Sequence, residues 1–303
     1  MVWVSRVGRP IDAAPQAEAW ATSWTAGALR DLRAAPAPSW PRFLGRAWQR
    51  ALGTARDERH LTRAWALESA ALIGVATIAA ADRGRARRAL WRPALAVCLT
   101  GIGALDGFVH LGLNRTSPGA PPFATLGPAL ALTHLRGACA ALLLADLVTG
   151  RSYGDRALRA LVVIAGLSDL LDGPLARRLG RATDLGRWHD AAADGAWTIA
   201  ILGQLAARGR IPRWLPPLAL ARFALPLFLG ARCYFGRVEP ALNSATGWGR
   251  LSGATLAALI GVALFPPRAA PLAVRLRPAL TAATSLTLVA AALAQAKRVM
   301  SDE

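Results

Sequence analysis

Long apolar blocks constrain this chain more than any other feature of its sequence. They cover residues 64–81, 93–113, 126–148, 157–175, 191–207, 214–235, 251–266 and 279–296. Most of them approach the roughly 20 residues that a helix needs to cross a bilayer. Because lipid offers no hydrogen bonds to the backbone, segments of this kind span a membrane as helices. The pattern therefore predicts an all-α integral membrane protein.

Ionisable residues interrupt several of these blocks. They are Arg136, Asp146, Asp169, Asp172, Arg222 and Arg232. A charged group at membrane depth is costly unless it faces a cavity or an oppositely charged partner. These interruptions predict a polar site inside the helical bundle.

The formal net charge of +18 fits a membrane surface better than a nucleic acid. Basic residues gather in the short gaps between apolar blocks, as in 83–92 and 208–213, where anionic lipid headgroups attract them. No basic stripe interleaved with aromatic residues is visible, so we expect no nucleic-acid partner. Cys98, Cys139 and Cys233 occur singly, which argues against a disulfide framework or a zinc site.

The chain divides into four predicted parts. Residues 1–38 are expected to form a flexible tail, and 39–59 an amphipathic helix at the membrane interface, although the same pattern suits a helix packed on its own protein. Residues 60–123 form an N-terminal extension with one or two membrane helices. Residues 124–298 hold six apolar blocks with short connections and are expected to be the catalytic domain.

Four aspartates lie within one predicted helix–turn–helix. Asp169 and Asp172 are three residues apart, and Asp190 and Asp194 are four apart, so on α-helices each pair projects from one face. If residues 178–187 form the turn, the two acidic faces can meet.

Carboxylates gathered in this way repel one another and resist ionisation unless cations neutralise them. Ligation by oxygen alone suits Mg²⁺ or Mn²⁺, and neither His nor Cys repeats nearby at a ligand spacing. Two such ions would clamp a diphosphate and stabilise a leaving phosphate. The cluster therefore predicts a site for two divalent cations.

The same segment carries a family resemblance. Asp169-x2-Asp172-Gly173-x2-Ala176-Arg177-x8-Gly186-x3-Asp190-x3-Asp194 resembles the complete signature of the CDP-alcohol phosphotransferases. Weaker similarities extend over residues 124–298 and comprise Thr133 with Arg136, Thr183, Arg222 and Gly249 with Arg250. The Pro and Lys that commonly follow the last two signature aspartates are absent, which leaves the acceptor open.

The resemblance implies a six-transmembrane-helix bundle and assigns roles by matched position. The four aspartates would hold the two metal ions, with Asp190 and Asp194 at the reaction centre and Asp194 as general base. Residues that would line the CMP half of the donor are Gly173, Ala176, Arg177, Thr183 and Gly186. Possible partners of an acceptor phosphate are Arg136, Arg222 and Arg250; alternatively, these arginines extend to the lipid headgroups.

The implied reaction moves a phosphoalcohol group from a CDP-alcohol lipid, with CDP-diacylglycerol preferred, to an alcohol and releases CMP. A polyol phosphate is the preferred acceptor, while serine or another phospholipid remain alternatives. The resemblance also implies a homodimer, in a bacterial cytoplasmic membrane with the site facing the cytoplasm. Two rival interpretations are an intramembrane prenyltransferase and a non-enzymatic divalent-cation-binding membrane protein.

Three further polar residues favour a structural interpretation. His189 is interpreted as an ordinary interfacial residue rather than a base. Asp106 and His110 share one helical face of the extension and are expected to make structural polar contacts.

Overall fold

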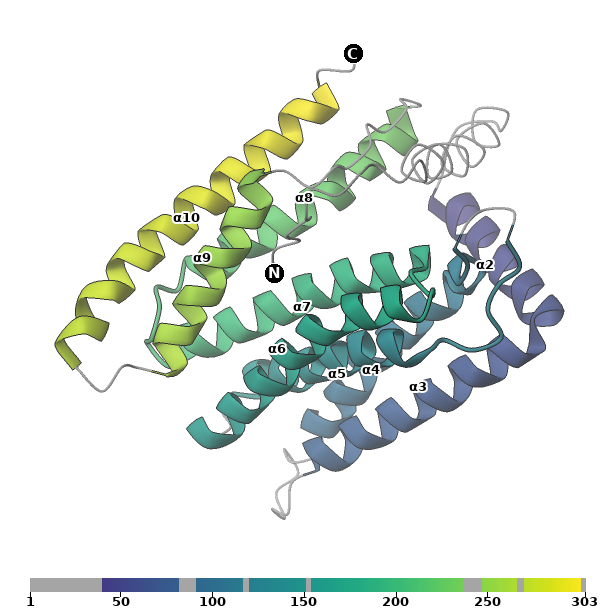
Figure 1. Ribbon diagram of the computed structural model, residues 1–303, viewed down its shortest axis with the longest axis horizontal. Helices are drawn as coiled ribbons and strands as arrows, with labels where there is room; N and C mark the ends of the chain where they lie inside the picture. The colour runs from purple at the N-terminus through teal and green to yellow at the C-terminus, as the bar shows by residue number, and fades with distance from the viewer. Residues whose placement is uncertain are drawn as a thin grey trace. The chain divides into compact units, whose positions relative to one another are not determined.

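The computed structural model describes residues 40–81, 91–116, 120–150, 154–236, 247–265 and 270–300, and within them all regular structure is helical (Figure 1). The elements are α2 (Trp40–Asp57), α3 (Arg59–Ala80), α4 (Trp91–Val109), the 3₁₀ turn η2 (Leu111–Leu113), α5 (Pro128–Thr149), α6 (Asp155–Arg178), α7 (Asp184–Ala207), α8 (Leu215–Gly236), α9 (Gly247–Leu264) and α10 (Ala270–Met300). The predicted tail at 1–38 and most of the arginine-rich gap lie outside the described residues.

Five described helical segments are long and apolar enough to cross a membrane. They are α3, α4, α5, α9 and residues Arg275–Ala296 of α10. Together with the length of the other apolar helices, this agrees with the predicted all-α integral membrane fold. Helices α6 and α7 are not among the five, and each carries two of the aspartates together with further charged residues.

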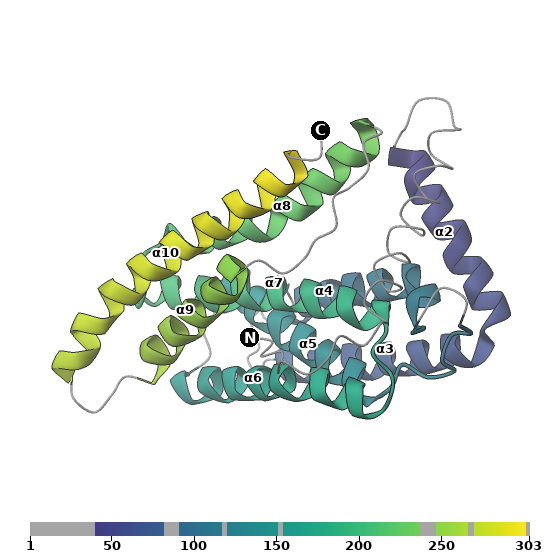
Figure 2. The ribbon, with the colours of Figure 1, turned by 45° about the horizontal axis from the view of Figure 1, so that its top comes forward.

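The described residues form two compact units: the first lies within residues 46–213, and the second comprises residues 40–45 and the described residues from 214 onward. In the first unit, α5 packs against α3, α4, α6 and α7 (Figure 2). It is apolar and buried around much of its circumference, as expected for a central helix. Glycine allows its close approach to α7, since a Cβ at Gly203 would lie 2.5 Å from Leu147 Cδ2.

The extension helices α3 and α4 pack on α5 within this same unit. Arg92 of α4 is buried, forms an ion pair with Asp146 of α5, and donates a hydrogen bond to the Ala80 carbonyl at 2.9 Å. The sequence had placed Arg92 in a gap that faces lipid headgroups, and this interpretation is wrong for Arg92. A buried guanidinium requires a partner, and Asp146 supplies it, so Asp146 is not part of the acidic site.

Helix α2 forms where the amphipathic pattern predicts it. Ala51 is buried, whereas Leu44, Trp48 and Leu52 are exposed. Trp48 also packs its ring 5.5 Å from that of Phe108. An exposed apolar stripe is typical of a helix that lies in the headgroup plane, and the interfacial location of α2 stays a prediction.

The second unit contains α8, α9 and α10, and α10 packs against the other two. Thr255 of α9 and Thr287 of α10 share a hydrogen bond of 3.0 Å. Arg222 of α8 donates to Gln295 Oε1 at 3.2 Å. These polar contacts between helices satisfy groups that lipid would leave without partners.

Candidate active site

A short turn sets the relation of α6 to α7. Gly180 adopts a left-handed conformation with φ of 63°, and the Arg181 amide donates to the Ala176 carbonyl at 2.8 Å; both are features of glycine-terminated helices. Thr183 then caps α7, accepting a hydrogen bond from the Gly186 amide at 3.0 Å. The turn therefore occupies residues 179–183, and the predicted turn over 178–187 was too long.

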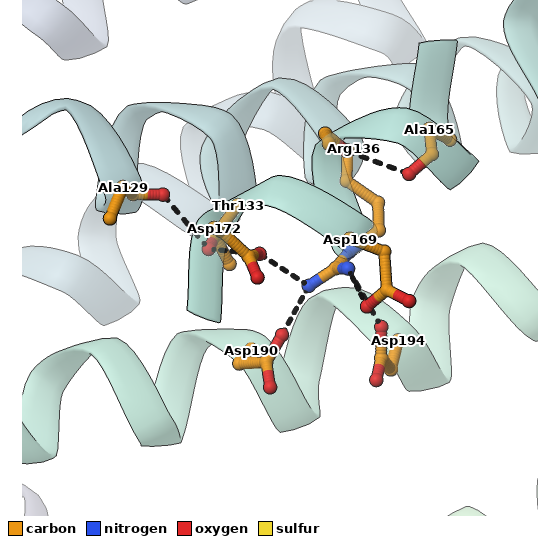
Figure 3. Close-up of polar contacts among 9 residues, drawn as sticks. Ala129, Thr133, Arg136, Ala165, Asp169, Asp172, Asp190 and Asp194 are labelled. Atoms are coloured by element: carbon orange, nitrogen blue, oxygen red, sulfur yellow. Dashed lines mark hydrogen bonds and ion pairs between the residues drawn. The ribbon is translucent and has the colours of Figure 1, made fainter. Parts of the chain in front are cut away.

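This turn brings the two acidic faces together, as the sequence predicted (Figure 3). One carboxylate oxygen from each of Asp169, Asp190 and Asp194 lies within 4.8 Å of the other two. Asp169 comes from α6, and Asp190 and Asp194 from successive turns of α7.

Asp172 is the most buried of the four aspartates and is anchored by a neighbouring helix. Thr133 of α5 donates a hydrogen bond from Oγ1 to Asp172 Oδ2 at 3.0 Å. A hydrogen bond to a carboxylate is stronger than one between neutral groups. Thr133 therefore orients a carboxylate that belongs to the predicted set of metal ligands.

The guanidinium of Arg136 lies among all four carboxylates (Figure 3). Its Nη1 contacts Asp169 and lies 3.2 Å from Asp194 Oδ1, while its Nη2 contacts Asp190 and lies 3.4 Å from Asp172 Oδ2. Its side chain is only 1% exposed. The sequence matched this arginine to an acceptor phosphate; the structure places it against the aspartates, and its role toward a phosphate stays a prediction.

The donor set fits a divalent metal centre. One guanidinium carries a single positive charge, whereas the four carboxylates can carry four negative charges, so further cationic charge would favour their ionised forms. Three of these carboxylates already place oxygens within 4.8 Å of one another. Ligation by oxygen alone is what Mg²⁺ and Mn²⁺ prefer.

The residues matched to nucleotide binding surround the end of α6 and the start of α7. A Cβ at Gly173 would lie 3.2 Å from Arg177 Nη1, so the missing side chain leaves room for this guanidinium. Ala176 lies on the same face one turn later, and Arg177 is exposed. Thr183 and Gly186 form the helix cap described above, which gives both a structural role; their contact with a nucleotide stays a prediction.

Arg222 and Arg250, the other two residues matched to an acceptor phosphate, belong to α8 and α9. Both helices are part of the second unit, whereas the aspartates are part of the first. The structure therefore does not test whether these arginines reach the acidic site.

Sequence reasoning missed a chain of polar contacts beside the aspartates. His189 is buried, so its interpretation as an ordinary interfacial residue is wrong. Its Nδ1 lies 2.6 Å from His134 Nε2, and His134 Nδ1 lies 2.5 Å from Glu68 Oε1. The only sequence signal was the position of each histidine next to a matched motif residue.

Asp106 and His110 make polar contacts, as predicted. His110 Nδ1 lies 3.2 Å from Asp106 Oδ1 and 2.9 Å from the Asp106 carbonyl oxygen. Asp106 also accepts a hydrogen bond from Trp188 Nε1 at 2.9 Å. The pair therefore joins the extension to the start of α7.

Comparison with known proteins agrees with the acidic signature. Residues 128–295, more than half of the chain, match the profile of the CDP-alcohol phosphatidyltransferase family, and the chain belongs to this family. It is also 44% identical over 72 residues to a cardiolipin synthase (CMP-forming) from Streptomyces coelicolor. That similarity covers 23% of this chain and 34% of the relative, so the chain spans about a third of its length. No solved structure matches.

Proposed function

We propose that this protein transfers a phosphatidyl group from a CDP-alcohol lipid, preferably CDP-diacylglycerol, to an alcohol and releases CMP. The observation that carries the proposal is that carboxylate oxygens of Asp169, Asp190 and Asp194 lie within 4.8 Å of one another. All three residues belong to the acidic signature and lie within the segment that matches the family. Family membership also argues against the rival interpretation as a prenyltransferase. The other rival interpretation is a membrane protein that binds divalent cations but catalyses no transfer. Measurement of CMP release distinguishes it from the proposed enzyme.

The acidic residues would hold two divalent cations, Mg²⁺ or Mn²⁺, which would polarise the diphosphate and stabilise the charge that develops on CMP. Asp194 would accept the proton of the acceptor hydroxyl. The hydroxyl oxygen then bonds to the phosphorus that bears the lipid alcohol, and the bond from this phosphorus to the CMP oxygen breaks. Gly173, Ala176, Arg177, Thr183 and Gly186 would hold the CMP portion during this exchange.

Two acceptor classes deserve direct comparison. The arginines matched to phosphate binding favour a polyol phosphate, because guanidinium groups pair well with phosphate. Similarity to a cardiolipin synthase favours phosphatidylglycerol instead, since its phosphatidylation produces cardiolipin. Incubation of the purified protein with CDP-diacylglycerol and each acceptor, followed by mass spectrometry of the lipids, separates these possibilities.

The remaining features of the proposal concern organisation. We assign 60–123 to the N-terminal extension, 124–298 to the catalytic domain, and 39–59 to an interfacial helix. A homodimer in a bacterial cytoplasmic membrane, with the acidic site facing the cytoplasm, follows the family resemblance. Cysteine labelling from each side of the membrane tests the orientation.

The central test is CMP release from CDP-diacylglycerol with and without Mn²⁺. Asp190→Asn should abolish CMP release, because an amide neither carries the negative charge nor ligates a cation as strongly as a carboxylate. Asp155→Asn is the matched control, since Asp155 lies on α6 but pairs with Arg210. Near-normal turnover of Asp190→Asn, or turnover that does not need a divalent cation, would overturn the proposed mechanism.

A further inference from the structure

A cavity of about 410 Å³ lies between the extension and the catalytic helices, bordered by α3, α4, α5 and α7. Its walls are mostly apolar or small side chains, among them Leu72, Leu99, Ile102 and Leu144. This volume falls in the range of about 300–1,000 Å³ that is typical of small-molecule sites. Because α3 and α4 supply one wall, the cavity depends on the N-terminal extension.

Two polar atoms of the cavity lining are buried and lack hydrogen-bond partners. They are His189 Nε2 and Thr100 Oγ1. His189 is 6% exposed, and its Nε2 lies 3.6 Å from Asp106 Oδ2, which is too far for a good hydrogen bond. Buried polar atoms without partners are rare and costly in folded proteins. The two atoms therefore point to a ligand with a polar group.

The neighbouring contacts determine what His189 Nε2 can bind. His189 Nδ1 is occupied by its contact with His134 Nε2 at 2.6 Å, so Nε2 is the ring nitrogen left for a ligand. The polar group that faces Nε2 is the carboxylate of Asp106, at 3.6 Å. A ligand hydroxyl suits this end of the cavity, because it can donate to a carboxylate or to an unprotonated ring nitrogen and can accept from a protonated one.

The charges around the cavity exclude anionic ligands. None of the described residues that line it is Lys or Arg, whereas Asp106 lines it with a carboxylate. A phosphate or a fatty-acid carboxylate would enter without a cationic partner and close to a negative charge, which is strongly unfavourable in apolar surroundings. A hydroxyl group supplies both a donor and an acceptor without introducing charge.

We propose that this cavity binds an uncharged lipid alcohol, with its hydrocarbon chain between α3, α4, α5 and α7 and its hydroxyl hydrogen-bonded to His189 Nε2. None of the four aspartates is among the residues that line this cavity. Thr133 nevertheless lines the cavity and also donates to Asp172. The lipid alcohol therefore lies directly behind a residue of the acidic site.

The test uses the full chain in phosphatidylcholine nanodiscs with a diazirine-bearing hexadecanol as photoaffinity probe. After illumination, mass spectrometry of peptides should find the label on the helices that line the cavity. Unlabelled hexadecanol should compete, whereas its methyl ether should compete about tenfold less well, because it lacks the hydroxyl proton and is bulkier at the oxygen that meets the buried polar atoms. Hexadecanoate and CDP-diacylglycerol should not compete at equal concentration.

A pair of glycine variants on α4 gives a matched control. Gly103 lines the cavity and Gly101 does not, and an added Cβ meets nothing within 4 Å at either position. Gly103→Leu should fill the cavity and reduce labelling about tenfold, which corresponds to a loss of about 1.4 kcal/mol in binding free energy. Gly101→Leu should be labelled to the same extent as the parent protein. Asp169→Asn should also label normally, so binding is measured independently of transfer activity.

Four results would overturn this proposal. Equal competition by hexadecanol and its methyl ether would remove the role of the hydroxyl. Competition by CDP-diacylglycerol would assign the cavity to the chains of the donor. Labelling outside the four helices, or labelling that Gly103→Leu leaves unchanged, would show that the alcohol does not occupy this cavity.

Discussion

Replacement of Thr133 by valine tests whether α5 orients the acidic site. The exchange keeps the shape of the side chain and removes the hydrogen bond of 3.0 Å to Asp172 Oδ2. A hydrogen bond to a charged group contributes about 1.5–3 kcal/mol, and every 1.4 kcal/mol corresponds to about tenfold in an equilibrium constant. If Asp172 ligates a cation, Thr133→Val should therefore weaken cation binding by about 10- to 100-fold, as loss of other groups that orient metal ligands does.

The measurement is CMP release as a function of Mn²⁺ concentration. Thr133→Val should need about 10- to 100-fold more Mn²⁺ for half-maximal turnover, and saturating Mn²⁺ should restore most of the rate. Thr149→Val is the matched control, because Thr149 also lies on α5 but donates to the Ala145 carbonyl of its own helix. An unchanged Mn²⁺ requirement, or a loss of turnover that added Mn²⁺ does not reduce, would refute the reasoning.

Two predictions concern packing around α5. Asp146→Ala should lower the free energy of unfolding by about 3–5 kcal/mol, because it leaves Arg92 buried without its carboxylate partner; thermal unfolding in detergent measures this, and replacing both residues by leucine should recover much of the loss. Gly203→Val should cost about 1–3 kcal/mol, since a Cβ there lies 2.5 Å from Leu147 Cδ2. Adding Leu147→Ala should relieve the crowding, so the double variant should lose less stability than the sum of the two single losses. Additive losses of the free energy of unfolding in the same assay would contradict this prediction.

Much of the acidic site could be predicted from spacing alone. Residues three or four apart share a helix face, so the placement of Asp169, Asp190 and Asp194 followed from helical periodicity and a short turn. The length of that turn was predicted less accurately. The pattern of polar and apolar residues does not distinguish a turn from the first polar residues of the next helix. Thr183 acts as the cap, which starts α7 earlier than expected.

The position of Arg136 could not be predicted in the same way. Its contacts with the four carboxylates depend on how α5 packs against α6 and α7, and helical periodicity within one segment carries no information about this packing. The same limit applies to Arg92, whose partner Asp146 lies 54 residues further along the chain. Charge at a helix end indicates a headgroup contact and a buried ion pair equally well.

The environment of His189 could not be predicted from its position next to the acidic motif. It precedes Asp190 on α7, so its side chain projects about 100° away from that carboxylate, toward His134 and the extension rather than the acidic cluster. The extension thereby contacts two helices that carry the site: Glu68 meets His134 on α5, and Asp106 meets Trp188 on α7. Because His134 lies between Thr133 and Arg136, these contacts hold the segment of α5 whose side chains reach the aspartates. The extension is therefore part of the structure that positions the acidic site, in addition to forming a wall of the neighbouring cavity.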